Sequence, residues 1–122
     1  MAIIKVQTIH RKGSKEINED ELLIEDNLFA VFDGATSLVP FRDKEGKTGG
    51  RIGAEIVKET FIQNNKSLKE LAVESNQRLR ERMEKEGIDL KQKQATWMVG
   101  AAVVRLLNEE AEFFQISDCF IL

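Results

Sequence analysis

The sequence has few of the residues that indicate a secreted, disulfide-stabilised or membrane protein. Its single cysteine, Cys119, excludes an intramolecular disulfide framework and favours a reducing compartment. The longest run without a charged or strongly polar residue, from Trp97 to Val104, is far shorter than the roughly 20 residues that span a bilayer. The N-terminus lacks the apolar stretch of a signal peptide. We therefore expect a cytoplasmic protein that does not associate with membranes.

The chain also lacks an excess of charge of one sign. It has 18 basic and 21 acidic residues, with a net charge of −3, which gives no reason to expect nucleic-acid binding. Basic and acidic residues alternate along 78–86, a pattern typical of a solvated helix face. With 122 residues and 42% hydrophobic content, the chain is long enough for one domain with a real core. The single histidine, His10, is expected to be structural.

Hydrophobic periodicity predicts strands toward both ends of the chain and two helices between them. Consecutive strands joined by hairpins favour antiparallel sheets with helices packed on a face, which is an α+β layered domain. The first half of the chain is expected to contain a strand at 3–8, a hairpin that turns at Asp26-Asn27, a loop at 35–48 and a helix from Gly49-Gly50. The second half is expected to contain a capped helix from Ser67 to a stop at Gly87, a buried strand at 96–107 and a partner strand at 111–117. Trp97 and Met98, within the buried strand, are expected to contribute to the core.

Two acidic residues occupy the open end of the predicted hairpin. A two-residue turn at Asp26-Asn27 would place Asp20 directly opposite Asp33, with Cβ atoms about 4.5–5.5 Å apart. Like charges at that distance repel unless a positive group lies between them, and a divalent cation is the simplest candidate. Alternation would place Glu19 on the opposite face from Asp20. An ordinary Asp-Gly turn at Asp33-Gly34 is the alternative interpretation.

An ordered set of motifs resembles the metal-dependent protein serine/threonine phosphatases of type 2C. The resemblance covers nearly the whole chain, and its strength lies in the order of the motifs. The motifs are Asn18-Glu19-Asp20, the strand 28–34 that ends in Asp33-Gly34, Gly49-Gly50 at a helix start, Ala95-Thr96 before an apolar strand, and Ile116-Ser117-Asp118-Cys119.

This resemblance implies an antiparallel β-sandwich flanked by helices in α-β-β-α layers. It also implies hydrolysis of phosphoserine and phosphothreonine in phosphoprotein substrates by water that two Mn²⁺ or Mg²⁺ ions activate. By resemblance, Asp33 would bridge the two metals, the Gly34 carbonyl would bind one of them, and Asp118 would hold a third metal. Glu19 would act on a metal through water, and Asp20 would orient metal-bound waters or assist proton transfer. Lys15 would contact the substrate phosphate.

The sequence departs from the family pattern at several positions. Lys15 stands where the family usually has arginine, so it supplies a charge without a bidentate fork. Ser117 and Cys119 replace the usual glycine and serine. The family's later Asp-Gly and Asp-Asn motifs would fall beyond residue 122, so we expect 1–122 to be the N-terminal part of the domain. Two alternatives stay open: a catalytically inactive interaction or regulatory module, and a half-domain that dimerises in place of a missing C-terminal half.

Overall fold

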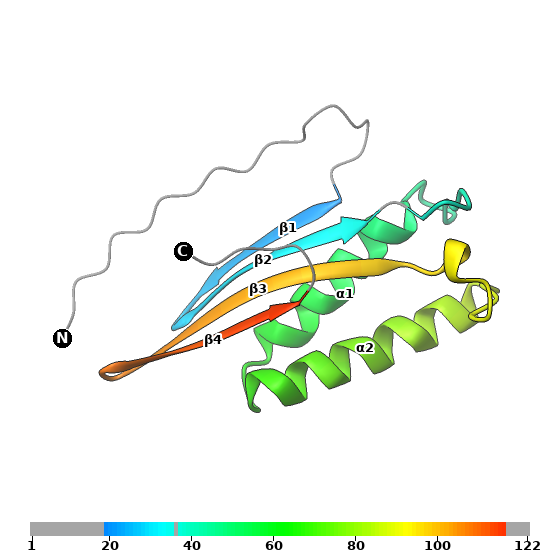
Figure 1. The fold of residues 1–122 in the computed structure, drawn as a ribbon. Coiled ribbons are helices and arrows are strands. Elements are labelled where there is room, and N and C mark those ends of the chain that lie inside the picture. Colours follow the sequence, from blue (N-terminus) through cyan, green and yellow to red (C-terminus); the bar gives the residue numbers. More distant parts are fainter. Residues whose placement is uncertain (1–18, 36, 117–122) are drawn as a thin grey trace.

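The computed structural model describes residues 19–35 and 37–116, which form one antiparallel sheet and two helices (Figure 1). The sheet has the strand order β1-β2-β3-β4, so each strand pairs with its neighbours in sequence among the strands. Helix α1 packs on the sheet and α2 packs beside α1. The bounds are β1 Asp20–Glu25, β2 Leu28–Ala35, α1 Gly49–Ile62, α2 Leu68–Lys85, the short 3₁₀ helix η1 Lys93–Ala95, β3 Met98–Leu107 and β4 Glu110–Ile116.

The predicted hairpin register is confirmed. β1 and β2 pair with Asp20 opposite Asp33 and Glu25 opposite Leu28. Asp26 takes a left-handed conformation with φ of 51°, which aspartate tolerates better than most residues and which suits a tight hairpin turn. The second hairpin differs slightly from expectation, because β4 already begins at Glu110. The α+β fold class is thus correct for the described residues, which contain one sheet layer and one helix layer.

Local capping explains where the helices begin and end. Ser67 accepts a hydrogen bond from the backbone N–H of Glu70 at 3.1 Å, as the capping-box pattern predicts. Gly87 follows α2 with φ of +80°, the left-handed conformation that commonly ends a helix. Thr48 caps α1 by accepting a bond from the N–H of Arg51 at 3.2 Å. No described helix combines the length and apolar character needed to cross a membrane.

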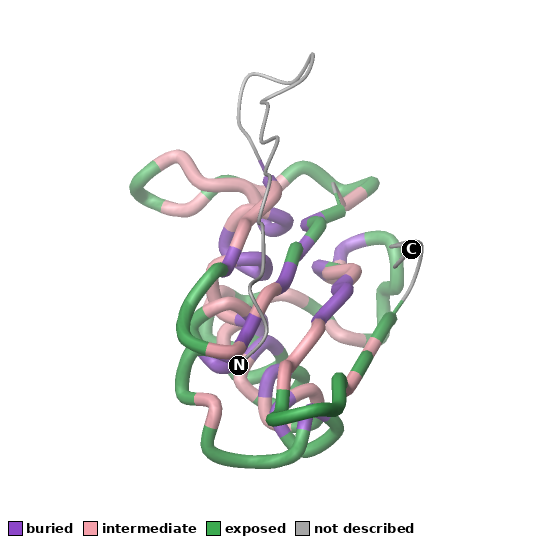
Figure 2. Tube along the Cα trace, turned by 90° about the vertical axis from the view of Figure 1, so that its left-hand side faces the viewer, coloured by how far each residue is buried: buried purple, intermediate pink, exposed green. Residues whose placement is uncertain are grey.

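Side chains alternate between two different faces of the sheet, and Figure 2 shows buried and exposed positions alternating along the strands. One face packs against the helices and forms the main core. The buried members of that core are Leu23, Leu28, Ala30, Phe32, Ala101 and Val103 from the sheet, and Ala54, Val57, Phe61, Leu68 and Leu71 from the helical side. Phe32 and Phe61 pack with ring centroids 5.6 Å apart.

The opposite face of the sheet, here called the open face, is not covered by the described helices. Its register positions are mostly apolar, and Ile24, Val31 and Phe113 are 46%, 46% and 62% exposed. The strand predicted to be buried along 96–107 is buried only at Trp97 and in its centre, at 101–103. The apolar face is consistent with the expectation of a partner layer outside the described residues.

A second hydrophobic cluster joins the two helices to the start of β3. Trp97 is 2% exposed and packs against Phe41 with tilted rings and a centroid distance of 5.1 Å, so its predicted core position is confirmed. The prediction for Met98 is wrong. Met98 is 60% exposed because it pairs with Ala35 on the open face. The predictions for the strand 3–8, Lys15, His10, Ser117, Asp118 and Cys119 lie outside the described residues.

Candidate functional site

The carboxylates of Asp20 and Asp33 form the centre of the candidate site. They occupy directly paired positions of β1 and β2, and Asp33 is exposed on the open face while Asp20 is half-buried. On its other side Asp33 pairs with Gly100 of β3, which brings no side chain to that row. Because cross-strand pairs lie about 4.5–5.5 Å apart at Cβ, the two acids can reach a common cation.

Glu19 lies on the other side of the sheet, as strand alternation predicts. Its side chain is 4% exposed and accepts a hydrogen bond from the hydroxyl of Thr48 at 2.7 Å. Glu21, two residues on, also contacts α1, through Arg51 at 3.1 Å and Lys58 at 3.3 Å. The acids of this segment therefore divide into two groups, with Asp20 toward Asp33 and both glutamates toward the helix.

The Asp33-Gly34 segment packs directly on the first turn of α1. The N–H of Gly34 donates to the carbonyl of Glu19 at 3.0 Å. A Cβ atom on Gly34 would overlap the backbone carbonyl of Gly50, and one on Gly50 would lie 2.9 Å from the Ala35 carbonyl. Only glycine permits this approach of two backbones. The Gly34 backbone is thus held against a helix end.

The Gly49-Gly50 pair has a steric reason at each position. A Cβ atom on Gly49 would overlap the indole ring of Trp97, which is buried beneath the start of the helix. A Cβ atom on Gly50 would meet the Glu19 carboxylate. The helix start is therefore enclosed by Glu19 just before β1, by the end of β2 and by Trp97 at the entry to β3. The sequence placed a helix here but did not predict why both positions must be glycine.

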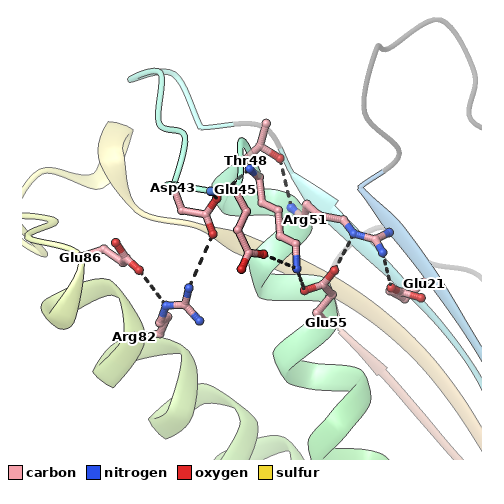
Figure 3. A network of polar contacts seen from close by, with 9 residues as sticks. Glu21, Asp43, Glu45, Thr48, Arg51, Glu55, Arg82 and Glu86 are labelled. Atoms are coloured by element: carbon pink, nitrogen blue, oxygen red, sulfur yellow. Dashed lines mark hydrogen bonds and ion pairs between the residues drawn. The ribbon is translucent and has the colours of Figure 1, made fainter.

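A polar network ties the loop 37–48 to both helices (Figure 3). Asp43 accepts hydrogen bonds from the backbone N–H groups of Glu45 and Lys47 at 2.9 and 2.8 Å, and lies 3.7 Å from the guanidinium of Arg82 on α2. Lys47 binds Glu55 of α1 at 3.2 Å. A loop of this length suggested function or mobility from sequence, but the structure shows that its second half is anchored.

These contacts also shift the ionisation of the loop residues. The hydrogen bond from the N–H of Lys47, with further help from Glu45 and Arg82, holds the pKa of Asp43 below its usual value of 3.8. The hydrogen bond to the Glu55 carboxylate raises the pKa of Lys47 above its usual value of 10.5. Both residues are therefore charged at neutral pH, and the network stays intact there.

The donor set fits a divalent cation in part. Asp20, Asp33 and the Gly34 carbonyl supply hard oxygen ligands, and Mg²⁺ is commonly bound by one or two carboxylates with several waters. Within 19–35 and 37–116, however, no group of three or more metal-ligating side chains gathers around one point. The residues present would therefore bind a largely hydrated ion, and Asp118 lies outside the described ranges.

Comparison with known proteins supports the fold more than any specific activity. No protein-family model and no curated protein matches the sequence. The crystal structure of a Mycobacterium tuberculosis serine/threonine phosphatase, PstP/Ppp, matches this chain with a TM-score of 0.69 and 16% identity. The match covers 89% of this chain and 44% of the phosphatase chain, so this chain corresponds to less than half of that protein. The chain therefore shares the fold of one part of a serine/threonine phosphatase.

Sequence reasoning missed the residues that join the hairpin to the helix. Thr48 precedes Gly49-Gly50 and is a favourable N-cap residue, so the sequence contained a signal for its role toward α1. Its contact with Glu19, 29 residues away, has no local signature. The roles of Arg51 and Lys47 in binding Glu21 and Glu55 were missed for the same reason.

Proposed function

We propose that this chain forms part of a metal-dependent protein phosphatase that hydrolyses phosphoserine and phosphothreonine in proteins. The observation that carries the proposal is the direct pairing of Asp20 with Asp33 on the open face, next to a glycine whose backbone packs on a helix start. The fold shared with a serine/threonine phosphatase supports it. So does the ordered set of motifs that resembles the type 2C family.

Each residue of the proposed site has a specific task. Asp33 and the Gly34 carbonyl would hold Mn²⁺ or Mg²⁺, with Asp118 as a further ligand. Asp20 would orient a water molecule next to Asp33 and accept a proton from that water. Lys15 would attract the substrate phosphate by its charge. The bound ions would supply Lewis acidity that activates water for attack on phosphorus.

Metal binding by the intact protein tests the proposal. Titration calorimetry with Mn²⁺ should give binding for the parent and at least about tenfold weaker binding for Asp33→Ala, since a bridging carboxylate is lost. Glu25→Ala is the matched control, because Glu25 lies at the far end of the same hairpin and should leave binding unchanged. Equal Mn²⁺ affinity of the parent and Asp33→Ala would refute the proposed role of Asp33.

A catalytically inactive interaction or regulatory module is the second candidate. It is favoured by the absence of a third metal-ligating side chain near Asp20 and Asp33 among residues 19–35 and 37–116. Phosphopeptide turnover separates the two functions. Turnover that depends on added Mn²⁺ and is abolished by Asp33→Ala supports the enzyme, whereas Mn²⁺ binding without turnover supports the inactive module.

A further inference from the structure

Glu19 is a buried acid with a defined partner on the helix side of the sheet. Glu19 is 4% exposed, and its carboxylate accepts a hydrogen bond from the hydroxyl of Thr48 at 2.7 Å. The same Thr48 oxygen accepts the N–H of Arg51 at 3.2 Å and so caps α1. One threonine thus connects the Glu19 carboxylate to the first turn of the helix. This connection is called here the Glu19–Thr48 contact.

The carboxylate of Glu19 also lies close to the backbone of that turn. A Cβ atom on Gly50 would approach its carboxyl carbon to 2.9 Å, so Gly50 leaves the space that the carboxylate needs. The N-terminal end of a helix presents unsatisfied N–H groups and a partial positive charge, which favour an anionic side chain there. The helix end therefore supplies a reason for a buried carboxylate at this position.

The main chain of Glu19 is connected to the candidate site itself. Its carbonyl accepts the N–H of Gly34 at 3.0 Å, and Gly34 in turn packs against the carbonyl of Gly50. Glu19 therefore contacts the end of β2 through its backbone and the start of α1 through its side chain. A shift of the helix start would be transmitted to Asp33-Gly34, because no side chain lies between the two backbones.

We propose that Glu19 is a positioning residue, which holds the first turn of α1 against Asp33-Gly34 through the Glu19–Thr48 contact. It would shape the metal site through the backbone of Gly34 rather than by acting on a metal through water, as the family resemblance implies. The inference rests on the proposed function for its metal-binding consequence. The contact itself can be tested without any metal.

Amide hydrogen exchange of the full chain without metal tests the contact. Thr48→Val removes the cap and the bond to Glu19, so exchange at Arg51 should rise about fivefold, the usual size of an N-cap effect. Glu19→Ala should raise it too, and the double variant should exceed the larger single effect by little, because both changes break one connection. Thr48→Ser and Glu19→Gln keep a donor and an acceptor and should restore most of the protection. Glu112→Gln is the control and should not affect Arg51, because the partner of Glu112 is Arg105 on β3 and neither residue contacts the start of α1.

Mn²⁺ titration of the same variants separates positioning from a direct role. If Glu19 positions Gly34, Thr48→Val and Glu19→Ala weaken Mn²⁺ binding by similar factors and Glu19→Gln retains most of it. If Glu19→Gln abolishes binding while Thr48→Val leaves it unchanged, Glu19 acts directly and the inference is overturned. If the parent binds no Mn²⁺, the proposed function fails but the inference does not, and the exchange data alone decide. Additive, independent effects of Glu19→Ala and Thr48→Val on exchange would then overturn it.

Discussion

Asp20 and Asp33 are direct cross-strand partners at one end of the open face, and no other strand position in the hairpin places two acids opposite each other. Opposed like charges in a sheet disfavour pairing by up to about 1 kcal/mol. Such repulsion works against the pairing at that row, and a cation that binds both carboxylates would relieve it. This relation gives a prediction about stability that is separate from catalysis.

The variant Asp33→Asn should be as stable as the parent or more stable by up to about 1 kcal/mol in the absence of divalent ions, because the repulsion is removed. Mn²⁺ at ten times its dissociation constant should stabilise the parent by about 1.4 kcal/mol and the variant by much less. Urea unfolding with and without Mn²⁺ measures both effects. Glu109→Gln, in the exposed second turn, is the control and should follow the parent. A destabilised variant without metal would contradict the repulsion argument.

Replacement of Gly34 should damage the fold more than replacement of a helical glycine. In Gly34→Ala the new methyl group meets the backbone carbonyl of Gly50, which cannot rotate away, so we expect a loss of about 3 kcal/mol or more. In Gly53→Ala the nearest atoms belong to the side chains of Val99 and Leu79, at 2.8 and 3.3 Å. The better helix propensity of alanine offsets that crowding, so the net change should stay within about 1 kcal/mol. Similar losses measured by chemical denaturation would show that the Gly34 packing is not special.

Asn27 connects the first hairpin turn to two other elements. Its amide donates to the carbonyl of Leu106 at 2.8 Å and its oxygen accepts from Asn64 at 2.9 Å. Asn27→Ala leaves these groups without their partner and should cost about 1–3 kcal/mol in the free energy of unfolding. Asn108→Ala, in the exposed second turn, should change it by less than about 0.5 kcal/mol. Equal effects of the two substitutions would mean that the hydrogen bonds of Asn27 add little to the free energy of unfolding.

The charge of Asp43 should contribute to stability in a defined pH range. A carboxylate whose pKa is lowered in the folded protein stabilises it above the unfolded pKa, and that contribution disappears as the pH falls through the folded pKa. The stability difference between the parent and Asp43→Asn should therefore be constant near neutral pH and shrink below pH 3.8. Thermal unfolding from neutral pH to about pH 2 measures it. A difference that does not change with pH would exclude this role.

We expect the 122-residue chain to self-associate through its open face. Phe113, at 62% exposure, lies among apolar neighbours on this face, whereas Val73, at 64%, lies on α2. Phe113→Gln should weaken self-association about tenfold or more, because a large apolar side chain leaves the contact surface. Val73→Gln should leave association unchanged. Light scattering over a range of concentrations measures both, and a parent that stays monomeric throughout would contradict the expectation of a dimer through this face.

Local interactions explain the parts of the fold that could be predicted. The hairpin register depends on a two-residue turn between alternating strands, and the start of α2 depends on Ser67 and Glu70 three residues apart. Burial of Met98 was predicted wrongly because an apolar residue in a strand can face either side. Only the pairing with Ala35 shows which face it takes.

The order of the elements, their caps and the opposition of Asp20 to Asp33 follow from the sequence alone, because each depends on residues close together in the chain. The contact of Glu19 with Thr48 and the packing of Gly34 on Gly50, by contrast, depend on the three-dimensional fold. These contacts join segments that are 16 or more residues apart, and they form only when the helix is laid across the sheet. Spacing along the chain carries no information about that arrangement, since packing of the whole core selects it.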